Sequence, residues 1–150
     1  MNLAAAAAIA AIALAVYLVV TDWVSLAPWN KVEDVPIRQK LLLSLTNYTP
    51  LLFIAFAVLQ ENRILMALAL FVGAVDLLMH VVYWWLPYLR GTTDEQSAER
   101  ASLFGGTTTF LPPIGDHPIP NAQHVVVGLL MILMVAATAG AAIGAFSRAG

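Results

Sequence analysis

Two ionisable side chains, Asp76 and His80, lie within one apolar stretch of the sequence, residues 64–86. A charge placed in a bilayer costs at least about 2.5 kcal/mol, so such residues usually face a bundle interior or a functional site. Because the two are four residues apart, they share one face of a helix. They can share a proton, which makes Asp76 and His80 the candidates for acid–base chemistry.

Other polar side chains are expected at the same level of the membrane. Helical rise places His80 ~10 Å and Asn47 ~9 Å below the side on which the stretch ends. His124 would lie near the surface of that side. Together these groups would form a polar pocket in one leaflet for a small or amphiphilic molecule. The predicted ligand-binding residues are Asn47, Tyr48, Asp76, His80, Tyr83, His117 and His124.

The histidines also raise the question of a cofactor. His80, His117 and His124 are a weak alternative set of metal ligands, which with a carboxylate would suit zinc or iron. His80 and His124 could instead hold a haem between two helices. No short ligand motif supports either group, so no metal is predicted and the cofactor stays open. The sequence has no cysteine, which excludes disulfides and thiolate ligands.

Each of these residues also has a purely structural interpretation. Asp76 and His80 can form a hydrogen-bonded clip between helices, and Asn47 can join two helices. His124 can cap a helix or sit at the interface, and His117 can be an exposed loop residue. The sequence alone does not decide between these structural roles and the functional ones.

Four long apolar stretches would position the polar residues. The chain has 150 residues, of which 61% are hydrophobic and 11% charged, whereas a soluble domain has ~45–50% and ~25%. Pro87 is expected to stop the third stretch and Asn121 to cap the fourth. We predict an all-α integral membrane four-helix bundle, one transmembrane domain over 1–150, with spans at about 3–20, 37–59, 64–86 and 123–146.

The connection over residues 87–121 is expected to be a long ordered loop that folds back as a lid. Thr93 with Gln96 matches a capping box at the start of a short helix, which Gly105 would end. Residues 107–120 contain four prolines among apolar side chains, so this part is stiff and poorly suited to a solvated linker. The alternative is an interfacial loop that only covers helix ends.

Charge and small residues indicate orientation and partners. The connections 21–40 and 87–121 contain five basic residues, against two on the other side, which predicts that these loops are cytoplasmic in a plasma or inner membrane. The five are Lys31, Arg38, Lys40, Arg90 and Arg100, and the two are Arg63 and Arg148. The net charge of −2 argues against nucleic acid, so the lipid bilayer is the expected partner. Ala136, Gly140 and Gly144 form a small-residue face for packing in the bundle or for a homo- or hetero-oligomer.

Three functions follow from this pattern. The first is a small four-span membrane protein whose polar pocket binds, or also acts on, a small or amphiphilic molecule through Asp76 and His80. The second is a non-catalytic accessory subunit of a larger membrane complex. The third is a small proton- or cation-coupled transporter. Whether the chain is an enzyme is left open by its sequence.

Overall fold

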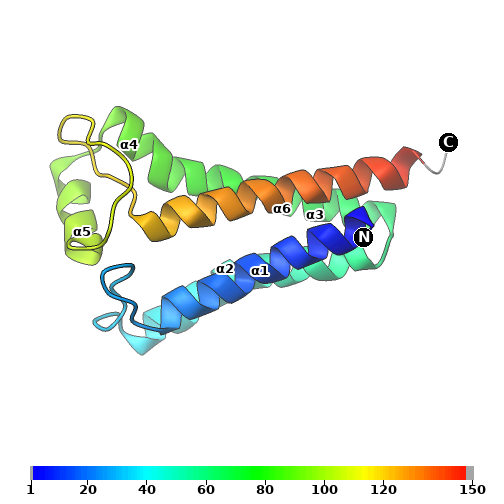
Figure 1. Cartoon of the computed structure of the whole chain (residues 1–150), viewed down its shortest axis with the longest axis horizontal. Helices are drawn as coiled ribbons and strands as arrows, with labels where there is room; N and C mark the ends of the chain where they lie inside the picture. The colour runs from blue at the N-terminus through cyan, green and yellow to red at the C-terminus, as the bar shows by residue number, and fades with distance from the viewer. Residues whose placement is uncertain (1, 148–150) are drawn as a thin grey trace.

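The computed structural model describes residues 2–147, and Arg148, one of the basic residues compared above, lies outside them. Four helices in this range are long and apolar enough to cross a membrane (Figure 1). Helices and no strand occur in residues 2–147, which confirms the all-α class. The elements are α1 (Leu3–Trp23), α2 (Ile37–Leu59), α3 (Arg63–His80), η1 (Val81–Trp85), α4 (Leu86–Arg90), α5 (Asp94–Phe104) and α6 (Ala122–Ser147).

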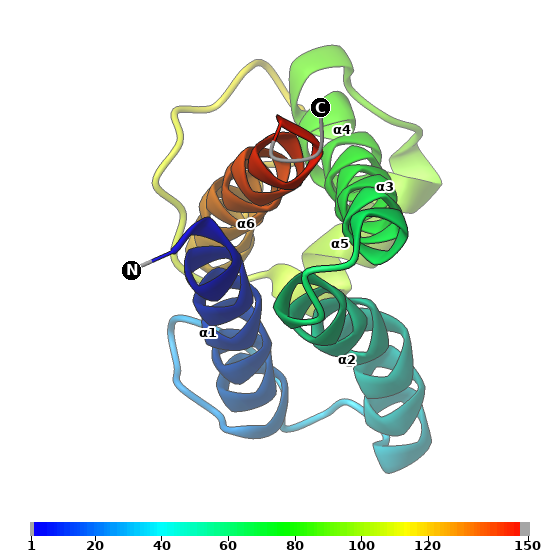
Figure 2. The same cartoon turned by 90° about the vertical axis from the view of Figure 1, so that its right-hand side faces the viewer.

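The long helices form an antiparallel bundle. Helix α1 packs against α2 and α6, and α3 packs against the same two helices from the other side (Figure 2). The short helix α5 lies at one end of the bundle, and the turn between α2 and α3 lies at the opposite end (Figure 1). We call these the loop end and the turn end.

Small side chains make the α1 interface tight. Ala7 and Ala11 are completely buried, as expected where short side chains allow helix backbones to approach. The bundle interior is filled by larger side chains that are also completely buried, among them Leu14, Ile54 and Met134. The large apolar side chains left exposed are spread along the outer faces of all four long helices, as in a bundle that faces lipid.

Pro87 does not end the third span, so that prediction is wrong. The helix continues from α3 through η1 and α4 to Arg90. In a regular α-helix a proline lacks the required N–H and its ring meets the carbonyl one turn earlier. Here a turn of π-helix, in which the Leu86 N–H bonds to the Val81 carbonyl, comes directly before the proline. The wider turn accommodates Pro87 and lets the helix continue.

Three other predictions about helix ends are confirmed. The Thr93 hydroxyl accepts the Gln96 N–H at 3.4 Å and starts α5, which ends before Gly105. The Asn121 Oδ1 atom accepts the His124 N–H at 3.1 Å, directly before the first residue of α6. These side chains satisfy N–H groups that have no partner inside the helix.

Residues 105–121 return from α5 to α6 across the loop end. The Thr108 N–H donates to the Pro28 carbonyl at 2.8 Å, and the Thr108 carbonyl accepts the Ala122 N–H at 2.7 Å. Phe110 packs edge-on against Trp29, with ring centroids 5.8 Å apart. These contacts join the two connections of the loop end. A long ordered loop that acts as a lid stays a prediction.

Candidate functional site

The site region begins where the third span crosses α6. His80, the last residue of α3, is only 8% exposed. A Cβ atom on Gly128 would lie 2.8 Å from His80 Nε2, so only glycine leaves room for the imidazole at this crossing. His80 Nε2 has no hydrogen-bond partner within residues 2–147. The His80 side chain is therefore packed into the helix crossing and does not line an open site.

An aromatic cluster joins three elements one turn further along. Trp84 of η1 is buried and stacks on the His124 ring of α6, with centroids 3.5 Å apart and planes at 25°. Phe104, at the end of α5, meets the Trp84 ring edge-on at 4.9 Å. Asn121 Oδ1 is hydrogen-bonded to His124 Nδ1 and so fixes the imidazole under Trp84. The cluster packs the end of α5 against the bundle.

Arg100 fastens the middle of α5 to the third span. Its guanidinium donates a hydrogen bond to the Tyr83 carbonyl and lies over the Tyr83 ring, 4.4 Å from the centroid. The same group lies 5.2 Å from the Trp84 centroid. Pro87 has no N–H to give to the carbonyls of the preceding turn, and Arg100 supplies a donor to one of them. The backbone around Tyr83 therefore combines three features: a π-turn, a proline four residues later and a hydrogen bond from Arg100.

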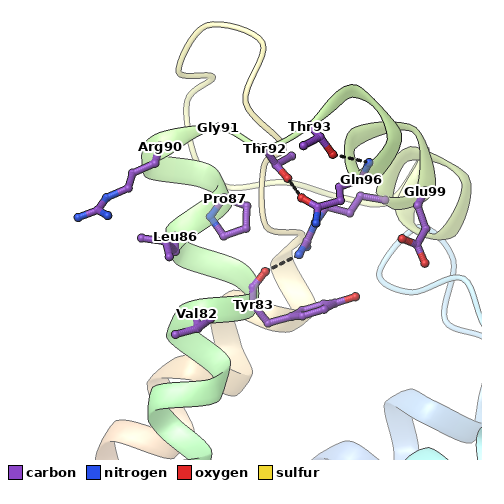
Figure 3. Close-up of a pocket in the computed structure, with 11 residues that line it drawn as sticks. Val82, Tyr83, Leu86, Pro87, Arg90, Gly91, Thr92, Thr93, Gln96 and Glu99 are labelled. Carbon is purple, nitrogen blue, oxygen red and sulfur yellow. Dashed lines mark hydrogen bonds between the residues drawn. The ribbon is translucent and has the colours of Figure 1, made fainter.

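A groove of about 630 Å³ separates α5 from η1 and α4. Figure 3 shows its two walls, with Val82, Leu86 and Pro87 on the third span and Gln96 and Glu99 on α5. The wall on the third span is apolar and aromatic from Val82 to Pro87 and ends in the cation Arg90, and the α5 wall and the connecting loop are polar. The lining residues are Val82, Tyr83, Leu86, Pro87, Arg90, Gly91, Thr92, Thr93, Gln96, Glu99 and Arg100.

One residue of the predicted pocket lines this groove. Tyr83 is 51% exposed and contributes both its ring and its carbonyl to the Arg100 contact. His80 and His124 lie behind the groove, in the helix crossing and the aromatic cluster. The structure therefore brings Tyr83, His80 and His124 to one region, but only Tyr83 reaches the groove wall.

The remaining predicted residues lie elsewhere. Asp76 is half-buried in α3, and no hydrogen bond joins it to His80 in the part of the chain described. Asn47 is exposed on α2, while the Tyr48 hydroxyl donates to Asp22 Oδ2 at 3.0 Å and links α2 to α1. His117 Nδ1 lies 2.9 Å from the carbonyl of Tyr88 in α4, and its ring packs against Gly91.

No set of metal ligands converges within residues 2–147. A group of three or more His, Asp or Glu side chains that could hold an ion is not found there. His117 rests against Gly91, whereas His80 rests against Gly128, so the three histidines of the alternative metal set are not brought together.

Comparisons with protein-family models, curated proteins and solved structures gave no match. The interpretation of the groove therefore rests on its own geometry and chemistry.

The sequence interpretation missed the basic residues of the groove. Arg90 and Arg100 entered it only as charges that orient the helices. The signal that was present is local: the short helix predicted after Thr93 carries a single basic residue, Arg100, and follows the aromatic run Tyr83–Trp85. Arg100 meets Tyr83 because α5 folds back on the third span, and no local pattern in the sequence specifies this contact.

Proposed function

We propose that the chain is a four-span integral membrane protein that binds an amphiphilic molecule in the groove between the third span and α5. The observation that carries this proposal is the two-sided character of the groove. Its apolar wall, with Val82 and Leu86, belongs to a helix of spanning length, and its polar wall belongs to α5 and the loop before it. An amphiphile also has an apolar part and a polar part, which would contact the apolar and the polar wall respectively.

The size of the groove supports a ligand rather than ordered water alone. Pockets for small molecules measure ~300–1,000 Å³ and combine an apolar lining with a few polar groups. The groove falls in this range at about 630 Å³ and meets both conditions. An acyl chain lying along Val82 and Leu86 would stay within the lipid-facing surface, because Val82 is 44% and Leu86 37% exposed.

This proposal keeps the amphiphilic ligand expected from the sequence and moves its position. The ligand lies beside Tyr83, and Asp76 and His80 are not assigned a catalytic role. The His80 imidazole occupies the space that a side chain at Gly128 would fill. We therefore assign His80 a packing role between α3 and α6, behind the groove. We propose that the loops 21–40 and 87–121 lie in the cytoplasm, the side that their basic residues favour.

Native mass spectrometry of the detergent-purified protein tests the proposal. We expect retained lipid-sized adducts on the wild-type chain. Leu86→Trp fills the groove and should reduce adduct occupancy about tenfold, which corresponds to about 1.4 kcal/mol. The matched control is Leu133→Trp on α6, where Leu133 is 62% exposed and outside the groove.

The same experiment separates the alternatives. Equal adduct loss in both tryptophan variants, or no adduct on the wild type, would reject the groove as a binding site. A co-purified protein subunit with no lipid adduct would favour the accessory-subunit function instead.

A second function, coupled transport of protons or cations, is favoured by one observation. Asp76 is half-buried within a helix of spanning length, and no hydrogen bond to another described residue acts on its carboxyl group. Intramembrane carboxyl groups of this kind mark ion pathways in many transporters. Proton flux into liposomes, followed with an enclosed pH-sensitive dye, would support transport if Asp76→Asn abolishes it. Wild-type liposomes without flux would remove this alternative.

A further inference from the structure

We infer that the groove selects an anionic phospholipid, one whose headgroup carries a phosphodiester and a net negative charge. This inference rests on the proposed function and names the ligand class of the same site. It follows from the charges of the lining residues, from the contacts that those residues already make, and from their position along the third span.

Arg100 is the fixed cation of the site. Arginine has five N–H donors in a planar fork that matches a phosphate or carboxylate. Within residues 2–147, the hydrogen bond of the Arg100 guanidinium goes to the Tyr83 carbonyl, which uses one of its donors. The aromatic rings below the guanidinium hold it at 4.4 Å and 5.2 Å. Arg100 is thus held in place with donors to spare.

The charges of the lining favour an anion. The groove contains two cations, Arg90 and Arg100, and one anion, Glu99, which leaves a net charge of +1 (2 − 1). Figure 3 shows Glu99 extending from the side of α5 that faces away from α4. The neutral groups Thr92 and Gln96 are hydrogen-bonded to each other. Among the lining residues, Arg90 and Arg100 are the charged donors, and the Gln96 side-chain amide and the Thr93 hydroxyl are neutral donors.

Arg90 lies at the outer lip of the groove. It is exposed, and in Figure 3 its side chain points away from α5, toward the surroundings of the bundle. Tyr83 and Arg90 are seven residues apart, which is ~10 Å along the helix axis. The groove therefore extends along the third span from Val82 to Arg90. This length is comparable to the thickness of the headgroup layer on one side of a bilayer.

An anionic headgroup fits this arrangement better than a zwitterionic one, although both contain a phosphodiester that can accept hydrogen bonds from Arg100. Charge-assisted hydrogen bonds from arginine to phosphate are about twice as strong as neutral ones. In a zwitterion the added cationic group would meet Arg90 at the outer lip, whereas a glycerol headgroup would not. The expected ligand is a phosphatidylglycerol-type lipid, with its phosphate at Arg100 and its headgroup toward Arg90.

The test uses equimolar phosphatidylglycerol and phosphatidylcholine with identical acyl chains, added to the delipidated full-length protein and measured by native mass spectrometry. We expect the wild type to favour phosphatidylglycerol about tenfold. Arg90→Gln should reduce this preference about two- to fivefold, because Arg90 is exposed and partly screened. Glu99→Gln should increase it. Arg38→Gln, a basic residue at the same end but outside the groove, is the matched control and should leave it unchanged.

Several outcomes would overturn the inference. Equal retention of both lipids would reject selection by charge, as would an equal effect of Arg38→Gln and Arg90→Gln, which would point to general surface charge. Displacement of the lipid by an excess of inorganic phosphate would show a site for the free anion instead of a lipid.

The failure of this inference is distinguishable from failure of the proposed function. If the two lipids bind equally and Leu86→Trp removes both, the groove binds amphiphiles without selecting an anion. If neither lipid binds, both proposals fall.

Discussion

The two ends of the bundle are held together in different ways. At the turn end, apolar side chains, most of them alanine, pack directly against one another, and Asn2 and Asn62 cap the starts of α1 and α3. At the loop end, polar and aromatic side chains join segments that are separated in the sequence. The pairs are Tyr17 with Trp29, Asp22 with Tyr48, Trp84 with His124, and Tyr83 with Arg100. The turn end is held by close packing of apolar side chains, whereas the directed contacts at the loop end border a groove.

The sharpest way to break this comparison is a pair of glycine substitutions on α6. A Cβ at Gly128 would lie 2.8 Å from His80 Nε2, whereas one at Gly140 would lie 3.8 Å from Leu3 Cδ1. Gly128→Ala should destabilise the protein by about 1–3 kcal/mol through overpacking. Gly140→Ala should be neutral or stabilise by up to about 1 kcal/mol through helix propensity. Unfolding in mixed detergent micelles measures both.

A double variant shows whether His80 causes the Gly128 effect. Removing the imidazole in His80→Ala should make Gly128→Ala less destabilising, since the added methyl group then has space. Equal costs of Gly128→Ala in the two backgrounds would contradict the packing described for this crossing.

Loss of the Arg100 contact should loosen α5 and leave the turn end unchanged. Arg100→Gln removes a charge-assisted hydrogen bond to Tyr83 and the contact with two rings. A loss of about 1.5–3 kcal/mol should speed amide exchange in α5 roughly tenfold to a hundredfold. Hydrogen exchange with mass spectrometry compares α5 with the start of α3. Unchanged exchange in α5 would mean that its other contacts, from Phe104 to Trp84 and from Lys31 to the Ser102 carbonyl, hold the helix without Arg100.

A smaller effect is expected where α1 meets α2 at the loop end. Tyr48→Phe removes the hydroxyl that donates to Asp22 Oδ2 at 3.0 Å. The variant should be less stable by about 1 kcal/mol. Thr46→Val is a control on the same helix, because the Thr46 hydroxyl bonds only to carbonyls of its own helix. Equal stability of Tyr48→Phe and the wild type would show that this pair contributes nothing.

The smallest expected effect concerns one exposed carboxylate in the connection after α1. The Ser25 hydroxyl donates to Glu33 Oε2 at 2.8 Å and holds the pKa of Glu33 below its ordinary value. A hydrogen bond to the charged form favours that form, and it is lost as the pH falls through the Glu33 pKa. Ser25→Ala should therefore raise this pKa, which NMR titration of the Glu33 side chain can follow. A constant pKa would contradict the contact.

The long helices could be predicted from the sequence because they depend on local properties. Apolar stretches near the length of a bilayer fix their number, and Thr93 and Asn121 fix two starts through their own side chains. The end of the third span could not be predicted in the same way. Pro87 stops a regular α-helix, and only the π-turn before it, which the sequence does not mark, allows the helix to continue to Arg90.

The groove was harder to predict for a related reason. Depth along a helix places His80 and Tyr83 in the right region, but the direction in which each side chain points depends on the π-turn and on the neighbouring helix. Gly128 decides that His80 is enclosed, and Arg100 meets Tyr83 only because α5 folds back on the span. Such contacts join residues far apart in the sequence, and no local pattern specifies them.

The most direct test of the account is photocrosslinking in a bilayer with a phosphatidylglycerol that carries a diazirine near the top of one acyl chain. Peptide mapping should find adducts enriched on Val82, Tyr83 and Leu86 above the general labelling of lipid-facing surfaces. An excess of unlabelled phosphatidylglycerol should remove this enrichment, and phosphatidylcholine should not. Uniform labelling of exposed residues on all four long helices, insensitive to either competitor, would contradict a lipid site at the loop end.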